Sequence, residues 1–205
     1  MKTEIIGLTG QTGAGKSTVA RFVTALPFKT AVIDADSVAR EALAVGSDCL
    51  KRLAKLFGYD IINSDGSCNR KLLASRAFSS KEQTQLLNAV THPWIIERVK
   101  EYILLYRSEK CDIILFDAPL LFESGGDSLC HKIIAVTAPD EIRLDRIIRR
   151  DGLSESEARL RMNAQHDEAY YSQRADFIID GSKSPEAVKK QVGNIIKEVC
   201  DEKAN

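Results

Sequence analysis

Short apolar runs alternate with stretches of helical periodicity along this chain. Runs with the length of buried strands occupy residues 5–8, 30–33, 112–116, 132–136 and 177–179. Residues compatible with helices separate these runs, and strands joined through helices pair in parallel, with helices on both faces of the sheet. The pattern therefore predicts an α/β fold built on a five-stranded parallel sheet.

The stretch between the second and third predicted strands has an almost wholly helical pattern. Its apolar residues recur at helical spacing, from Leu50 through to Tyr106. Because this stretch is longer than a simple crossover between parallel strands, we predict a helical insertion over residues 37–110. The dipeptide His92-Pro93 lies inside it, and Pro93 is expected to start or kink a helix.

The first apolar run leads into a glycine-rich stretch that fits the P-loop spacing, Gly10-x-x-x-x-Gly15-Lys16-Ser17. Glycines allow successive backbone N–H groups to turn toward phosphate oxygens, and the helix that follows points its positive end at the same oxygens. Lys16 is expected to reach the outer phosphates and Ser17 to hold Mg²⁺. The sequence context of strand, loop and helix favours a three-layer fold of the P-loop NTPase type.

Carboxylates follow two of the predicted strands. Asp34 and Asp36 come directly after the second strand, and Asp117 ends the third. Asp117 has the form of a Walker B aspartate, which supplies an oxygen ligand to Mg²⁺. Asp36 is placed to accept the proton of an acceptor hydroxyl, although an aspartate at this position also serves as the N-cap of a helix over residues 37–45.

Arginines are concentrated in the segment after the fourth predicted strand. Arg143, Arg146 and Arg150 share one helical face, and Arg161 follows in the next helix. Guanidinium groups match phosphate geometry, so residues 140–174 are predicted to form a lid over a triphosphate. The alternative is a solvated charged face that pairs with the acidic residues of the same helix.

The composition disfavours nucleic acid and membrane surfaces as binding partners of this chain. The chain has 29 basic and 29 acidic side chains, so it lacks the overall basic field expected of a protein that binds nucleic acid or a membrane surface. Its five cysteines form no C-x-x-C pair, and neither a signal peptide nor a membrane-spanning run is apparent. We therefore expect reduced thiols, a cytoplasmic location, and a monomer or weak homo-oligomer.

Several motifs together resemble the dephospho-CoA kinase family from about Ile5 to Val199. The P-loop is common to many kinases, so the specific likeness comes from Asp34-Ala35-Asp36, His92-Pro93 and Asp117-Ala118-Pro119-Leu120-Leu121-Phe122-Glu123. Three motifs continue the match toward the C-terminus, namely Arg146 with Arg150-Asp151, Arg161 with Gln165, and Ala175-Asp176-Phe177-Ile178-Ile179-Asp180.

The resemblance implies transfer of the γ-phosphoryl group of ATP to the ribose 3′-hydroxyl of dephospho-CoA, the last step of coenzyme A synthesis, with Mg²⁺. It implies a nucleotide-binding core in residues 1–36, 111–139 and 175–205, with residues 37–110 binding the acceptor. The family asparagine and glutamines are replaced here by Gly181, Arg143 and Asp145, where contacts to the adenine of ATP would otherwise be expected.

Site residues follow from the motifs and the resemblance together. Catalysis is assigned to Asp36 as the base, with Lys16, Arg146 and Arg150. ATP binding is assigned to Gly13, Ala14, Gly15, Lys16, Ser17, Thr18, Arg146 and Arg150. The acceptor is expected to contact Thr9, Asp36, Arg40, His92, Leu121, Phe122, Glu123 and Arg161. Mg²⁺ is expected at Ser17, Asp117 and Asp34.

Two other functions are compatible with part of this pattern. A P-loop followed by Asp-x-Asp also suits a kinase for nucleoside monophosphates or shikimate, but the long insertion and the segment from Pro119 to Glu123 disfavour that reading. A regulatory GTPase would need an Asn-Lys-x-Asp stretch to read guanine, and the chain contains none.

Overall fold

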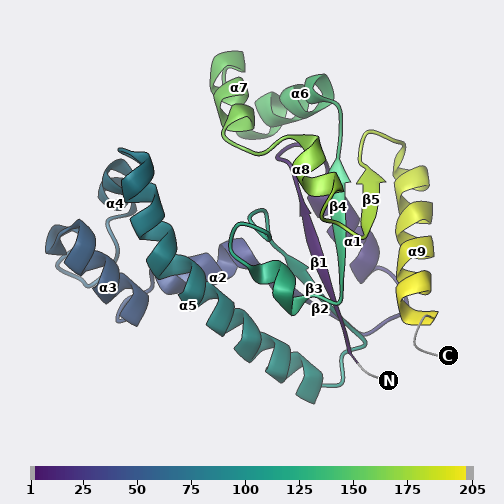
Figure 1. The fold of residues 1–205 in the computed structure, drawn as a ribbon, viewed down its shortest axis with the longest axis horizontal. Helices are drawn as coiled ribbons and strands as arrows, with labels where there is room; N and C mark the ends of the chain where they lie inside the picture. Colours follow the sequence, from purple (N-terminus) through teal and green to yellow (C-terminus); the bar gives the residue numbers. More distant parts are fainter. Residues whose placement is uncertain (1–2, 202–205) are drawn as a thin grey trace. The chain divides into compact units, whose positions relative to one another are not determined.

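The computed structural model describes residues 3–201, which form two compact units (Figure 1). The first unit is built from the described residues of Met1–Ile33 and Leu105–Asn205, and the second from Asp34–Leu104. Within residues 3–201, no helix is both long and apolar enough to cross a membrane.

The first unit contains the five-stranded sheet expected from the apolar runs. Its strands are β1 (Glu4–Gly10), β2 (Thr30–Asp34), β3 (Ile113–Asp117), β4 (Lys132–Thr137) and β5 (Phe177–Asp180), in the order β2-β3-β1-β4-β5. β1 pairs in parallel with β3 and β4, and β4 pairs in parallel with β5. The prediction of a parallel, doubly wound α/β sheet is confirmed.

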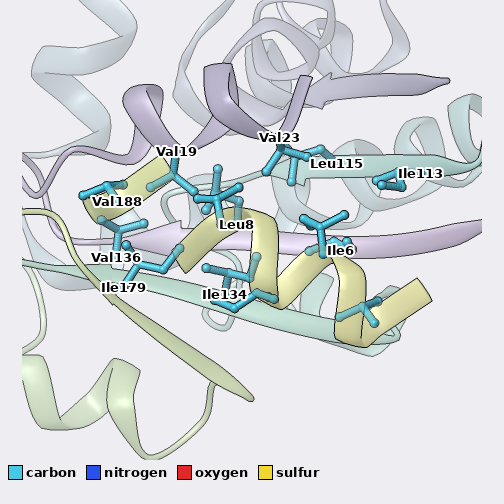
Figure 2. Packing of buried hydrophobic residues seen from close by; sticks show 14 of the residues in the cluster. Ile6, Leu8, Val19, Val23, Ile113, Leu115, Ile134, Val136, Ile179 and Val188 are labelled. Atoms are coloured by element: carbon cyan, nitrogen blue, oxygen red, sulfur yellow. The ribbon is translucent and has the colours of Figure 1, made fainter. Parts of the chain in front are cut away.

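Two helices cover one face of this sheet. α1 (Lys16–Thr24) and α9 (Pro185–Asp201) pack against each other and against the strands. Figure 2 shows Val19 and Val23 of α1 and Val188 of α9 among the strand side chains, which include Leu8, Leu115 and Val136. The apolar residues of α9 that face the sheet are all buried, namely Val188, Val192, Ile195, Ile196 and Val199.

The opposite face carries the polypeptide that follows β3. The 3₁₀ helix η2 (Gly126–Leu129) lies against this face. Gly126 packs so close to the Phe116 ring that a side chain at this position would not fit. α8 (Glu168–Ser172) contacts β4. The sheet is therefore the middle of three layers, as expected.

α6 (Asp140–Asp151) and α7 (Glu155–Asn163) pack together beyond the carboxyl end of β4 (Figure 1). Leu144, Ile147, Ala158 and Met162 bury their side chains between the two helices. Ser154 begins α7 with a capping box, in which its hydroxyl and the Glu157 carboxylate each bond the other residue's backbone N–H. The pair has a small core of its own.

β2 differs from the sequence prediction. Its apolar run suggested a fully buried strand, but only Ile33 is buried and Val32 is 39% exposed. The reason is its place at the edge of the sheet, where one side has no neighbouring strand. Apolar runs do not distinguish edge strands from central ones when the edge strand is short.

The second unit is helical, as predicted for the insertion. It contains α2 (Ala35–Ala42), α3 (Asp48–Phe57), η1 (Tyr59–Ile61), α4 (Arg70–Ala77) and most of α5 (Lys81–Ser108). A separate apolar core joins them, with Leu50, Leu53, Phe57 and Ile61 among its buried members. α2 ends at Ala42, earlier than the expected end at residue 45.

Pro93 was expected to start or kink a helix, but it does not begin one. It lies inside α5, which runs for 28 residues. Proline removes one backbone hydrogen bond from a helix interior. Val90 and Trp94, on either side of Pro93, pack against the core of the second unit, and this packing stabilises the helix through the proline.

All five cysteines lie within the described residues, and each is a free thiol. Burial raises the pKa of Cys130 to about 12, and the nearby carboxylates of Asp127 and Asp176 act in the same direction. The thiol is therefore protonated at neutral pH. The reduced state of the cysteines stays a prediction from the sequence.

Candidate active site

The P-loop begins where β1 meets β4. Gly10 has φ +137°, and a Cβ at this position would lie 2.2 Å from the carbonyl oxygen of Val136. Only glycine allows the chain to leave the sheet so close to its neighbour. Ala14 N then donates to Gln11 O at 3.1 Å, which closes the outer turn of the loop.

The start of α1 is arranged to receive an anion. Gly15 is its N-cap residue, with a left-handed backbone and no side chain to cap the helix, and no acidic residue stands in the first turn. Within the described part of the chain, no protein acceptor bonds the backbone N–H groups of Gly13, Gly15, Lys16 or Ser17. These donors and the positive end of the helix form the cradle predicted from the glycine spacing.

Lys16 and Asp117 form an ion pair beside this cradle. Their side chains are 19% and 17% exposed, so the pair is largely removed from solvent. The strand register explains the contact, because β1 and β3 are neighbours and Leu8 lies opposite Asp117. The structure thus brings together the P-loop lysine and the carboxylate predicted to follow the third strand.

Two arginines of α6 hold the outer side of the P-loop. Arg143 Nε donates to Thr12 O at 3.0 Å, and Arg146 Nη1 donates to Gly13 O and Ala14 O, each at 3.2 Å. Carbonyl groups that point outward to these arginines leave the loop's N–H groups free to face inward.

The alternative of a solvated charged face holds for only part of this helix. Arg143 is 2% exposed and bonds Asp140 at 2.9 Å, so it is buried. The Arg150 side chain is 54% exposed and pairs with Asp151, as that alternative expects. Burial lowers the pKa of Arg143, and the charge of Asp140 opposes that effect. The sequence showed only that Arg143 stands where the family has a glutamine. It did not show that this arginine supports the P-loop.

Gly181 approaches the P-loop from the turn after β5. Arg146 Nη2 donates to Gly181 O at 2.8 Å, and a Cβ on Gly181 would lie 1.9 Å from Ala14 O. Asp180 accepts hydrogen bonds from the hydroxyl and backbone N–H of Ser182, and these bonds lower the pKa of Asp180. The replacement of the family asparagine by glycine therefore allows a close backbone contact.

The substitution Gly181→Ala is expected to displace Ala14 and weaken ATP binding at least about tenfold, because backbone atoms rather than a flexible side chain meet the new methyl group. Overpacking of this kind costs about 1–3 kcal/mol of stability, which lowers Tm by about 2–12 °C in a chain of this length. Titration calorimetry and thermal unfolding measure both effects.

Gly193→Ala is the matched control for that experiment. Gly193 lies in α9 with no atom within 4 Å of the added Cβ, and alanine is preferred over glycine inside a helix. Its Tm should stay the same or rise slightly. Equal losses in the two variants would contradict the close-contact explanation for Gly181.

Asp34, not Asp36, caps α2. Asp34 Oδ1 accepts from the backbone N–H of Asp36 at 3.0 Å, and Asp34 Oδ2 accepts from the Ser37 hydroxyl at 2.7 Å. The alternative reading of Asp36 as the cap is therefore wrong. The Asp36 carboxylate is exposed in the first turn of α2, and no described residue donates to it. Asp34 thus fixes the backbone that presents Asp36.

The segment from Asp117 to Glu123 packs into the first unit. Thr9 is buried and its hydroxyl donates to Pro119 O at 3.4 Å, while Leu121 is fully buried beneath Gly7. Phe122 contacts Tyr170 edge-on, with ring centroids 5.9 Å apart. Glu123 Oε1 lies 3.7 Å from His166 Nε2, and its Oε2 is buried without a hydrogen bond.

Aromatic rings surround this segment. Tyr171 is fully buried, and burial raises its pKa to about 12, with Glu123 adding to the shift. His166 stacks on Tyr170 at 3.7 Å, and the Arg174 guanidinium lies 4.0 Å from the centroid of the same ring. Sequence reasoning missed His166, because a single histidine between two helices carries no motif.

Arg150 and Arg161 meet at one carboxylate. Arg150 bonds both oxygens of Asp151, and Arg161 Nη1 bonds Asp151 Oδ2 at 2.7 Å. The bond from Arg150, followed by its charge and that of Arg161, lowers the pKa of Asp151. Arg146 contacts the P-loop directly, whereas Arg150 and Arg161 instead link the end of α6 to α7.

The remaining predicted site residues are Arg40 and His92 in the second unit and Ser17 and Thr18 in the first. Arg40, in the last turn of α2, donates from Nε to the carbonyl of Asp36 at 3.2 Å. His92 is partly buried in α5. Ser17 and Thr18 lie in the first turn of α1 in the first unit, where Thr18 N bonds Gly15 O.

The dephospho-CoA kinase family model matches residues 4–186. The dephospho-CoA kinase of Corynebacterium diphtheriae is 40% identical over 186 residues, which are 91% of this chain and 92% of that protein. The chain belongs to the dephospho-CoA kinase family. The resemblance stated from the motifs is therefore confirmed over nearly the whole chain.

Solved structures agree with membership of the dephospho-CoA kinase family. The dephospho-CoA kinase from Campylobacter jejuni is 29% identical, with a TM-score of 0.70 over 98% of each chain. TT1252 from Thermus thermophilus is 31% identical, with a TM-score of 0.77 over 97% of this chain and 98% of that one. Shikimate kinase from Bacteroides thetaiotaomicron, 14% identical with a TM-score of 0.56, shares the fold alone.

Proposed function

We propose that the protein transfers the γ-phosphoryl group of ATP to the ribose 3′-hydroxyl of dephospho-CoA, giving coenzyme A and ADP. The observation that carries this proposal is the P-loop itself. Its backbone N–H groups lack protein acceptors, and Lys16 and Asp117 meet beside them in a chain of the dephospho-CoA kinase family.

ATP occupies the cradle formed by Gly13, Ala14, Gly15, Lys16, Ser17 and Thr18. The backbone N–H groups bind phosphate oxygens, and the Lys16 ammonium neutralises charge on the transferring group. Arg146 adds positive charge next to Gly13 and Ala14. Arg150 reaches the phosphates only if it leaves Asp151, so its part in catalysis depends on movement of residues 140–174 as a lid.

The residues present fit Mg²⁺. Ser17 and Asp117 offer a hydroxyl and a carboxylate, and this ion is held by one or two carboxylates together with substrate phosphates and water. No group of three or more acidic, histidine or cysteine side chains that could hold a metal by itself occurs in residues 3–201, which agrees with a shared site of this kind. Bound Mg²⁺ supplies charge neutralisation at the phosphates.

Asp36 is the general base of the proposed reaction. Its carboxylate takes the proton of the 3′-hydroxyl as that oxygen bonds to the γ-phosphorus, and the bond to the bridging oxygen breaks with its electron pair leaving on ADP. Asp34 supports this role by holding the backbone N–H of Asp36. Both Asp34 oxygens already accept hydrogen bonds from residues of α2. The chief role of Asp34 is therefore to position Asp36, and contact with Mg²⁺ is its lesser role.

The acceptor is bound by residues 37–110 and by the segment that ends at Glu123. The residues proposed to contact it are Thr9, Arg40, His92, Phe122, Glu123 and Arg161. Leu121 is buried, so it shapes this segment from beneath. A cytoplasmic location and a monomeric or weakly self-associating state remain predictions from the sequence.

A coupled assay of ADP release tests the proposal with dephospho-CoA, AMP and shikimate side by side. Rapid release should depend on dephospho-CoA and Mg²⁺, with less than about one hundredth of that rate for the other two acceptors. Turnover driven by AMP or shikimate instead would favour the alternative small-molecule kinases. Tight GTP binding without acceptor-dependent turnover would favour a nucleotide switch.

A further inference from the structure

Two glutamines join the P-loop to the segment that leaves α7. Gln165 Oε1 accepts a hydrogen bond from the Thr12 backbone N–H at 2.8 Å, and Gln11 Nε2 donates to the backbone carbonyl of His166 at 3.0 Å. Each glutamine therefore bonds the main chain next to the other glutamine. We refer to this pair of hydrogen bonds, made by Gln11 and Gln165, as the glutamine clasp.

The clasp acts on the part of the P-loop that sets the direction of its peptide groups. Thr12 N is held by Gln165 and Thr12 O by Arg143, so side chains from the α6–α7 region fix both peptide groups that flank Thr12. Thr12 lies inside the turn that the hydrogen bond from Ala14 N to Gln11 O closes. If the Thr12 peptide rotated, the N–H of Gly13 would turn with it, because that N–H belongs to the same peptide as Thr12 O.

The other end of the clasp is tied to the helix pair. Gln165 N bonds Met162 O at 3.1 Å, and Met162 is buried between α6 and α7. A displacement of α7 therefore moves Gln165. Gln11 is 6% exposed and lines a cavity of about 730 Å³ together with Arg143, Gln165 and His166, so water can reach the Thr12 N–H once the clasp opens.

We propose that Gln165 and Gln11 are positioning residues for phosphate binding: the glutamine clasp couples the position of the α6–α7 pair to the conformation of the P-loop. With the clasp closed, the Thr12 peptide is fixed and the Gly13 N–H faces the phosphate cradle. With it open, the loop samples other conformations and binds ATP less tightly. This inference rests on the proposed binding of ATP at residues 13–18.

The test compares Gln165→Met, which has a similar volume but no acceptor oxygen, with Gln165→Glu, which keeps one. Gln11→Met removes the donor on the other side. Gln191→Met is the matched control, because Gln191 Nε2 also bonds a backbone carbonyl, that of Ile178 at 2.8 Å, but lies in α9. Amide exchange at Thr12 is followed by NMR without substrates, and KM for ATP and kcat are measured separately.

In Gln165→Met and Gln11→Met, KM for ATP should rise about five- to tenfold with kcat within about twofold, the effect of losing one neutral hydrogen bond. The Thr12 amide should exchange at least about tenfold faster in Gln165→Met and stay protected in Gln165→Glu. Gln191→Met should match the wild type in each measurement.

Wild-type exchange at Thr12 or an unchanged KM in Gln165→Met would overturn the inference, as would an equal effect of Gln191→Met. A fall in Tm without any change in KM would assign the clasp a structural role only and would also overturn it. Because exchange is read without ATP or an acceptor, these outcomes are distinct from failure of the proposed function, which would appear as absent dephospho-CoA-dependent turnover of the wild type.

Discussion

Replacing Lys16 with methionine is expected to lower kcat/KM for ATP by about 10²- to 10³-fold, the cost of removing one preorganised charge from the transition state. Methionine keeps most of the apolar length of the side chain but lacks the ammonium group that meets Asp117 at the cradle. Steady-state kinetics with dephospho-CoA as acceptor measure the change.

Lys189→Met is the control for this prediction, because Lys189 is an exposed lysine on α9. Its kinetics should match those of the wild type. If Lys16→Met kept more than about a tenth of wild-type kcat/KM, Lys16 would have no part in stabilising the transferring phosphoryl group. Loss of such a stabilising contact lowers the rate by about 10²- to 10³-fold.

Asp36→Asn is expected to reduce kcat at least about 10²-fold while leaving ATP binding unchanged, because an amide accepts no proton from the 3′-hydroxyl. The change is nearly isosteric, and the Asp36 carboxylate accepts no hydrogen bond from the described residues, so the fold should not suffer. Calorimetric titration with an ATP analogue separates binding from turnover.

Asp48→Asn provides a matched control in the same helical unit. Asp48 also lies in the first turn of a helix, α3, and pairs at the surface with Lys51. Its kcat should equal that of the wild type. Near-normal turnover in Asp36→Asn would remove Asp36 from the role of base and direct attention to Asp34.

The conformation of the P-loop could be predicted from the sequence alone, because it depends on local chain geometry. Gly10, Gly15 and Lys16 follow one another at a spacing whose physical purpose is known, and the apolar runs predicted which strands precede the P-loop and Asp117. Local rules of this kind are visible in a single sequence.

Contacts between distant segments could not be predicted in the same way. Arg143 looked like one more charged residue on a helix, yet it is buried against Thr12, which is 131 positions away. Gly181 looked like a lost adenine contact, yet it meets Ala14. Such roles depend on how β1, β4 and β5 align in the sheet, and no residue pattern records that alignment.

The N-cap of α2 was assigned to the wrong aspartate because two candidates lie close together in the sequence. Asp34 and Asp36 both suit the start of a helix, and the choice between them depends on whether the helix begins at residue 35 or 37. Boundaries shift by one or two residues without changing the pattern of apolar positions. Only the hydrogen bond from Asp36 N to Asp34 decides the question.

The central claim is that Asp36 is the general base for the ribose 3′-hydroxyl and that residues 13–18 hold the phosphates of ATP. A crystal structure with a non-hydrolysable ATP analogue, Mg²⁺ and dephospho-CoA tests it directly. The account predicts the Asp36 carboxylate within about 3 Å of the ribose 3′-oxygen, in line with the γ-phosphorus above Lys16. A 3′-oxygen nearest to Asp34 or to no carboxylate, or phosphates bound away from Gly13–Thr18, would contradict it.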